Sequence, residues 1–204
     1  MLGGGDERVN KTQGWRGGLL FEAVRSLCLW AYARRGWTVE GAVPDTGRFV
    51  IIAAPHSSNW DFPLMLCVAL HLRLKIHWIG KLSLFRWPMG GLMRALGGIP
   101  VDRSRSNNLV EQMAERFGRE QEFALAVPPE GTRARVSQWK TGFLAIATAA
   151  NVPIALGFLD YRRKVGGIAG TFMTTGDMDA DMAAVRARYA GFTSLADLRN
   201  AQRR

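Results

Sequence analysis

Short apolar runs alternate along the chain with longer segments in which apolar residues recur at helical spacing. A continuous apolar run bounded by polar turns is typical of a strand buried on both faces, as in a parallel sheet. The predicted strands are 38–40, 48–54, 75–80, 97–101, 123–127, 152–158 and 165–172. The predicted helices are 19–32, 62–72, one that begins after Asn108, 141–150, 177–189 and 193–204. This alternation predicts an α/β fold with a mostly parallel central sheet flanked by helices.

The length of the chain limits the number of domains. With 204 residues it is long enough for one well-buried domain and too short for two comfortable ones. Residues 1–18 contain no apolar core of a signal peptide and no cleavage-site pattern, so we expect them to form a flexible leader. The single domain is predicted over residues 19–204.

The segment 19–32 is predicted to be an amphipathic helix. Its apolar stripe consists of Leu20, Val24, Leu27, Cys28 and Ala31, and the opposite side carries Glu22, Arg25 and Ser26. These charges disfavour a membrane span, which needs roughly 20 mostly apolar residues. We expect the apolar stripe to pack in the core, as in most amphipathic helices. A helix lying in the interface of a bilayer is the alternative.

The predicted strand 48–54 runs into a polar turn that carries His56, and Asp61 stands at the start of the next helix. Open α/β sheets place their chemistry at such turns, beyond the carboxyl ends of the strands. Asp61 can fold back onto one imidazole nitrogen of His56 and leave the other nitrogen free as a general base. The alternative is that Asp61 caps the helix and that His56 satisfies a loop carbonyl.

Two more predicted strands end in polar turns. One is followed by Asp102 and Arg103, and the other by a turn that contains Glu130 and Arg133. If the three strands are parallel neighbours, their turns converge on one edge of the sheet. Lys81, which follows the predicted strand 75–80, is a further candidate for this edge. The simpler interpretation is that these are solvated surface pairs and ordinary turn residues.

The formal net charge of +10 indicates an anionic partner, which could be nucleic acid, an anionic bilayer or a phosphorylated substrate. The basic residues are scattered and no nucleic-acid-binding signature is present, so nucleic acid is not expected. Cys28 and Cys67 lie in apolar runs and are predicted to be core thiols. His71 and His77 have no carboxylate or cysteine at ligand spacing, so no metal site is expected.

Four blocks of the sequence resemble the ordered motifs of the glycerolipid acyltransferases, the lysophosphatidic acid acyltransferase family. They are His56-x4-Asp61, Gly98-Ile99-Pro100-Val101-Asp102-Arg103, Pro129-Glu130-Gly131-Thr132-Arg133 and Val152-Pro153-Ile154. The first block alone is a weak signal, but four blocks in the right order are a specific one. The resemblance implies a glycerol-3-phosphate acyltransferase-like fold. It also implies transfer of a fatty acyl group from acyl-CoA or acyl carrier protein to a lysophospholipid hydroxyl, with 1-acyl-glycerol-3-phosphate as the leading acceptor, in phospholipid biosynthesis.

The resemblance also implies a role for each matching residue. His56 would remove the proton of the acceptor hydroxyl, and Asp61 would hold the imidazole and stabilise its charge. The implied acceptor and phosphate site consists of Arg103, Glu130, Gly131, Thr132 and Arg133, to which the strand pattern adds Lys81. The implied acyl side consists of Val152, Pro153 and Ile154. The sequence has no G-x-S-x-G motif, which agrees with direct transfer and no acyl-enzyme.

An enzyme of this kind would need no cofactor, because the acyl thioester is a co-substrate, and it would act peripherally on the cytoplasmic face of an anionic membrane. Pro128, Ala134 and Leu156 depart from the residues usual in the family, but they leave the His56 and Asp61 pair untouched. Two alternatives stay open. One is a different acceptor, such as glycerol-3-phosphate, an amino-acid lipid or a glycolipid. The other is a basic membrane-binding module without catalysis.

Overall fold

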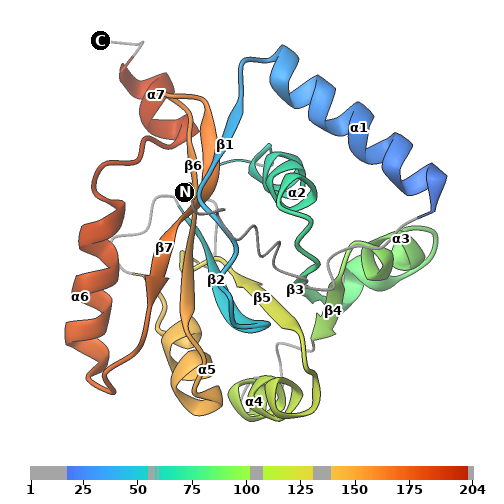
Figure 1. Ribbon diagram of the computed structural model, residues 1–204. Helices are drawn as coiled ribbons and strands as arrows, with labels where there is room; N and C mark the ends of the chain where they lie inside the picture. The colour runs from blue at the N-terminus through green and yellow to red at the C-terminus, as the bar shows by residue number, and fades with distance from the viewer. Residues whose placement is uncertain (1–17, 55–57, 59, 102–107, 131–138, 202–204) are drawn as a thin grey trace, which may run out of the picture.

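The computed structural model describes residues 18–54, 58, 60–101, 108–130 and 139–201, and a seven-stranded sheet forms its centre (Figure 1). The strand order is β1-β7-β6-β2-β5-β3-β4. The strands are β1 (Thr38–Glu40), β2 (Arg48–Ala54), β3 (Ile76–Lys81), β4 (Gly98–Val101), β5 (Phe123–Val127), β6 (Ile154–Asp160) and β7 (Val165–Phe172). Strands β6, β2, β5, β3 and β4 are parallel, whereas β7 is antiparallel to β6 and β1 is parallel to β7. The predicted α/β fold with a mostly parallel sheet is confirmed.

Helices cover both faces of this sheet (Figure 1). The helices are α1 (Leu19–Arg34), α2 (Asp61–His71), η1 (Leu82–Phe85, a 3-10 helix), α3 (Gly90–Ala95), α4 (Leu109–Arg119), α5 (Gly142–Ala150), α6 (Met178–Tyr189) and α7 (Leu195–Ala201). Side chains of α4, α5 and α6 share one core cluster with β2, β5 and β6. Val68 of α2 and Tyr32 of α1 belong to a cluster with Leu159 of β6.

Strand β2 shows why its sequence is apolar throughout. Val50 and Ile52 point into the cluster shared with α5, and both are fully buried. Phe49 and Ile51 point to the other face of the sheet and are buried in a second cluster. Successive side chains of a strand alternate between the two faces, so a central strand covered on both faces is apolar at every position.

Helix α1 packs with only part of the predicted apolar stripe, of which Cys28 and Ala31 are half-buried. Val24 and Leu27 of the predicted stripe are exposed, by 51% and 64%. Arg25, predicted to face solvent, donates from Nε to the carbonyl of Leu70 at 2.8 Å, and Arg73 donates to Glu22 at 2.9 Å. The physical reason is that the last carbonyls of α2 lack partners within their own helix, and a guanidinium can satisfy them.

The structure also bears on the expectations for the two cysteines, for metal binding and for a membrane span. Cys28 and Cys67 are free thiols and both are half-buried. The described parts of the chain contain no group of three His, Cys, Asp or Glu residues placed to hold a metal ion. Within the same parts, no helix is both long enough and apolar enough to cross a membrane. Apart from Gly18, the predicted leader 1–18 lies outside the described residues.

Candidate active site

The carboxyl ends of the five parallel strands lie at one edge of the sheet, called here the carboxyl edge. Ala54 of β2 pairs in register with Phe158 of β6, and Lys81 of β3 pairs with Val101 of β4. The segments that follow β2, β4 and β5 at this edge carry the predicted site residues. The predicted site residues His56, Arg103, Gly131, Thr132 and Arg133 lie outside the described residues.

Asp61 is the first residue of α2, and its side chain has no exposure to solvent. Its Oδ2 accepts the backbone N–H of Ser58 at 2.8 Å, and its Oδ1 accepts the hydroxyl of Tyr161 at 2.6 Å. Trp60, not Asp61, occupies the N-cap position of α2. Both oxygens of Asp61 thus have a donor, and the side chain lies at the positive end of the helix dipole. Asp61 is therefore held in a fixed orientation in the interior, at the carboxyl edge.

Tyr161 is a site residue that the sequence analysis missed. It directly follows β6, which ends at Asp160. Its backbone N–H donates to the carbonyl of Thr193 at 2.9 Å, and its ring packs edge-on against Trp37 with centroids 5.1 Å apart. The signal that could have found it is its position, because the turn after β6 leaves the sheet at the same edge as the three turns considered above.

Lys81 and Glu130 are the two predicted acceptor-site residues that the structure describes. Lys81 ends β3 and has an exposed side chain, so its ammonium group is available at the carboxyl edge. Glu130 follows β5 and is half-buried. The carbonyl of Pro129, next to Glu130, accepts the N–H of Lys140 at 2.7 Å. Residues on either side of the undescribed segment 131–138 are therefore joined near the end of β5.

Comparison with known proteins identifies the family. The Acyltransferase family profile matches residues 37–155, which is more than half of the chain. The chain belongs to the Acyltransferase family. The resemblance seen in the sequence is thereby confirmed, and membership indicates an enzyme that transfers acyl groups. No curated protein matches the sequence.

The fold of this family member is also similar to a solved structure. That structure is the 1-acyl-sn-glycerophosphate acyltransferase PlsC from Thermotoga maritima, with a TM-score of 0.57 and 18% sequence identity. The match covers 86% of this chain and 82% of the chain of PlsC. At this identity the likeness concerns the fold, which is the glycerol-3-phosphate acyltransferase-like fold that was expected.

The predicted acyl-side block lies away from Asp61. The carbonyl of Pro153 accepts the N–H of Val50 near the start of β2, and Ile154 begins β6. At about 3.3 Å per residue, Ile154 lies roughly 20 Å from Asp160 at the other end of the strand. Val152 and Ile154 are buried in the core. These side chains stabilise the start of β6 by packing, and their role on the acyl side stays a prediction.

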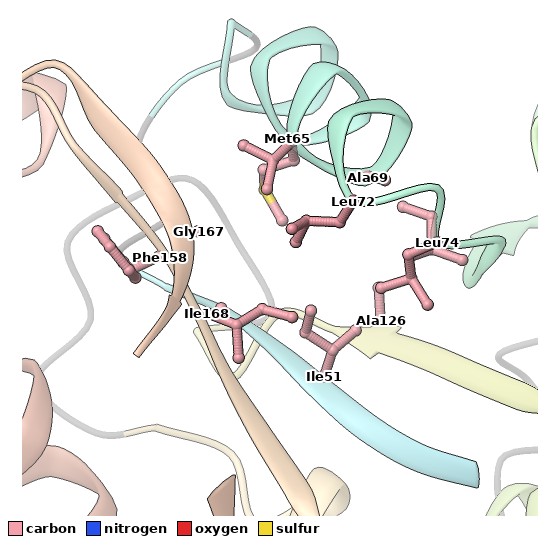
Figure 2. A pocket seen from close by; sticks show the side chains of 12 residues that line it. Ile51, Met65, Ala69, Leu72, Leu74, Ala126, Phe158, Gly167 and Ile168 are labelled. Carbon is pink, nitrogen blue, oxygen red and sulfur yellow. The ribbon is translucent and has the colours of Figure 1, made fainter. Parts of the chain in front are cut away.

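A small apolar pocket lies between α2 and the sheet. Figure 2 shows Met65 and Ala69 of α2, with Leu72 just after it, facing Ile51 and Ile168 across the pocket. Its volume is about 30 Å³. A cavity needs only about 10–15 Å³ of such volume to hold one water molecule. The pocket is therefore too small for a fatty acyl chain in this conformation.

A larger hollow lies at the opposite edge of the sheet, where β2, β3 and β5 begin. Its volume is about 290 Å³ and its lining includes His77, Glu120 and Lys75. The ring of His77 lies 4.9 Å from that of Phe123, and the side chain is 9% exposed. Burial, together with the nearby charge of Arg116, lowers the pKa of His77. His77 is thus remote from Asp61 and is a buried, neutral histidine.

Proposed function

We propose that this protein transfers a fatty acyl group from an acyl thioester, acyl-CoA or acyl carrier protein, to a hydroxyl of a lysophospholipid, and that it acts in phospholipid biosynthesis. The leading acceptor is 1-acyl-glycerol-3-phosphate. The observation that carries the proposal is the buried Asp61 carboxylate, held at the carboxyl edge in a chain of the Acyltransferase family. His56 stands five residues before it in the sequence.

In the proposed reaction, His56 removes the proton of the acceptor hydroxyl while the oxygen attacks the thioester carbonyl. The C–S bond then breaks, the imidazolium returns its proton to the leaving thiolate, and an ester and a free thiol result. Asp61 accepts the other N–H of the imidazole and stabilises its positive charge. The donors from Ser58 and Tyr161 fix Asp61 before substrate binds, so little reorganisation is needed during the reaction.

The burial and the raised pKa of Cys67 favour direct transfer over an acyl-enzyme. Cys67 lies in the same helix as Asp61 and is half-buried. Burial, and the neighbouring Cys28, raise the pKa of the Cys67 thiol. A thiol is nucleophilic only as the thiolate, so a raised pKa makes Cys67 a poor nucleophile.

The acceptor phosphate is proposed to bind to cationic groups at the carboxyl edge. Lys81 is exposed there, and its register partner Val101 directly precedes Asp102 and Arg103 in the sequence. Arg103 and Arg133 are proposed as bidentate ligands of the phosphate, because a guanidinium matches two phosphate oxygens. Glu130, Gly131 and Thr132 complete the proposed acceptor site.

The proposed place of action is the cytoplasmic face of an anionic membrane, to which the protein binds peripherally and without a cofactor. The exposed stripe of α1 supports this proposal, since Val24, Leu27 and Trp30 face solvent. A helix with such a stripe can lie in the interface of a bilayer. The guanidinium of Arg34 lies over the ring of Trp30 at 5.8 Å, where it could meet a lipid headgroup.

The test is release of free thiol from acyl-CoA in the presence of 1-acyl-glycerol-3-phosphate, followed by chemical identification of the product. His56→Ala should lower the rate by about 10³-fold or more. His71→Ala is the matched control, because His71 is exposed at the end of α2 and should be dispensable. Equal rates for wild type and His56→Ala would refute the proposed mechanism. If thiol were released only with another acceptor, that acceptor would replace 1-acyl-glycerol-3-phosphate in the proposal.

A further inference from the structure

The segment that follows β3 exposes an unusual number of large apolar side chains. Trp87 is 93% exposed. The other large exposed apolar residues of this segment are Leu82, Leu84, Met89 and Leu92. These five residues, from η1, α3 and the turn between them, are called here the Leu82–Leu92 surface. Single exposed apolar residues are ordinary, but a group of this kind usually marks a binding site.

The segment is anchored to the sheet by one aromatic residue, and this leaves the five residues free to face outward. Phe85 is buried, and its ring stacks on that of Trp78 with centroids 5.9 Å apart. A Cβ atom on Gly98 would lie 2.7 Å from the Phe85 ring, so glycine at this position lets the ring lie against β4. The Leu82–Leu92 surface therefore belongs to a fixed part of the fold.

The charged residues of this segment all have one sign. Residues 62–101 contain no Asp or Glu, whereas Lys81, Arg86 and Arg94 lie within or beside η1 and α3. All three of these basic residues are exposed. Basic residues close to an anionic leaflet favour binding to it. Tryptophan flanked by basic residues is typical of the membrane interface.

The surface also lies at the same edge of the sheet as Asp61. Helix η1 begins immediately after Lys81, at the carboxyl end of β3, and this is the edge at which Asp61 lies. In the view of Figure 1, α3 and the first turn of α1 are drawn at the same margin of the molecule. A planar surface that meets the Leu82–Leu92 surface would therefore approach the carboxyl edge.

We propose that the Leu82–Leu92 surface inserts its apolar side chains into the interfacial region of an anionic phospholipid bilayer. This holds the carboxyl edge against the leaflet that carries the acceptor lipid. The identity of that acceptor rests on the proposed function, but the docking itself requires no catalysis. The basic side chains of Lys81, Arg86 and Arg94 then meet the anionic headgroups, and Trp87 enters the region beneath them.

The test is flotation of the purified protein with vesicles of phosphatidylcholine and phosphatidylglycerol. The variants Trp87→Glu and Leu92→Glu should each weaken partitioning by about tenfold or more. In each variant a carboxylate replaces an apolar group that would enter the bilayer, and the anionic lipid repels it. Met173→Glu is the matched control. Met173 is an exposed apolar residue between β7 and α6, and its substitution changes the net charge by the same amount. Thermal unfolding of all variants checks that they fold.

Three results would overturn the proposal. The first is wild-type protein that does not float, and the second is Trp87→Glu and Leu92→Glu variants that float as well as Met173→Glu. The third is a wild-type dimer in sedimentation that is lost in Trp87→Glu while flotation is unchanged. That result would assign the surface to contact between two copies of the chain.

A second assay separates failure of docking from failure of the proposed function. Thiol release is measured with a short-chain acceptor that is monomeric in water and with a long-chain acceptor embedded in vesicles. Trp87→Glu should keep the rate with the monomeric acceptor and lose about tenfold or more with the embedded one. Equal losses with both acceptors would overturn the docking role. Wild-type flotation without thiol release would instead refute the proposed function and leave docking supported.

Discussion

The hydroxyl of Tyr161 donates a hydrogen bond of 2.6 Å to Oδ1 of Asp61 across a sequence separation of 100 residues. This bond joins the residue after β6 to the first residue of α2. The end of β6 and the start of α2 are thereby held together at the carboxyl edge. A short hydrogen bond from a hydroxyl to a carboxylate is among the stronger ones in proteins. The orientation of Asp61 therefore depends on Tyr161.

Tyr161→Phe should lower kcat while the KM for acceptor stays nearly unchanged, because Tyr161 is proposed to position Asp61 without touching substrate. A hydrogen bond to a charged group contributes about 1.5–3 kcal/mol, so the loss of kcat should be roughly 10- to 100-fold. Tyr189→Phe is the matched control, since the Tyr189 hydroxyl donates to the carbonyl of Gly157 at 2.9 Å in the core. It should lower the melting temperature and leave kcat intact. Equal effects of both substitutions on kcat would argue that Tyr161 is merely structural.

Asp61→Asn should lower kcat by about 10²-fold or more, because the amide cannot stabilise an imidazolium as a carboxylate does. Asp181→Asn provides the comparison. Asp181 is also a buried carboxylate, and it accepts the backbone N–H and the hydroxyl of Thr175. Both substitutions place an NH2 group opposite a donor and should reduce stability to a similar extent. Only Asp61→Asn should reduce turnover of the fraction that remains folded, as measured by thiol release.

Lys81→Ala should raise the KM of a phosphate-bearing acceptor by about tenfold, because a charge-assisted hydrogen bond to phosphate is lost. The KM of the acyl donor should change much less. Lys75→Ala is the control, since Lys75 is exposed at the amino edge of the sheet, one residue before β3. An unchanged acceptor KM in Lys81→Ala, with normal kinetics of the control, would remove Lys81 from the acceptor site.

The fold could be predicted from the sequence because the central parallel strands are covered on both faces. Phe49 and Val50 are neighbours in β2, yet each is buried on its own side of the sheet. Such a strand is a continuous apolar run in the sequence. The polar turn that follows it marks the carboxyl edge even when the neighbouring strands are not known. The position of Asp61 at that edge followed from the same pattern.

The contacts that the sequence could not predict are those in which a side chain meets a distant backbone or a distant polar group. Arg25 of α1 packs inward because the carbonyl of Leu70 accepts its guanidinium, and no periodicity in α1 contains this information. Tyr161 meets Asp61 only because β6 lies beside β2. The block at Val152 was assigned by resemblance alone, and the strand direction places it at the opposite edge.

Lowering the pH should destabilise the fold through His77. Burial, with a contribution from the charge of Arg116, lowers its pKa in the folded protein below the usual value of 6.5. Lys75 acts in the same direction, whereas Glu120 opposes it. In the unfolded chain His77 takes up a proton near pH 6.5, while in the folded protein it stays neutral to lower pH. The unfolded state therefore binds more protons in this interval, and the free energy of unfolding falls as the pH decreases below about 6.5.

His77→Leu should flatten this part of the pH dependence, because the variant has no imidazole to protonate on unfolding. The measurement is urea unfolding of wild type and variant at a series of pH values from neutral to mildly acidic. His71→Gln is the control for the replacement of a histidine, since His71 is exposed. The aromatic contact with Phe123 is also lost in His77→Leu, so the comparison concerns the slope with pH and not the stability at neutral pH. A slope that is the same in His77→Leu and wild type would show that the acid sensitivity arises elsewhere in the protein.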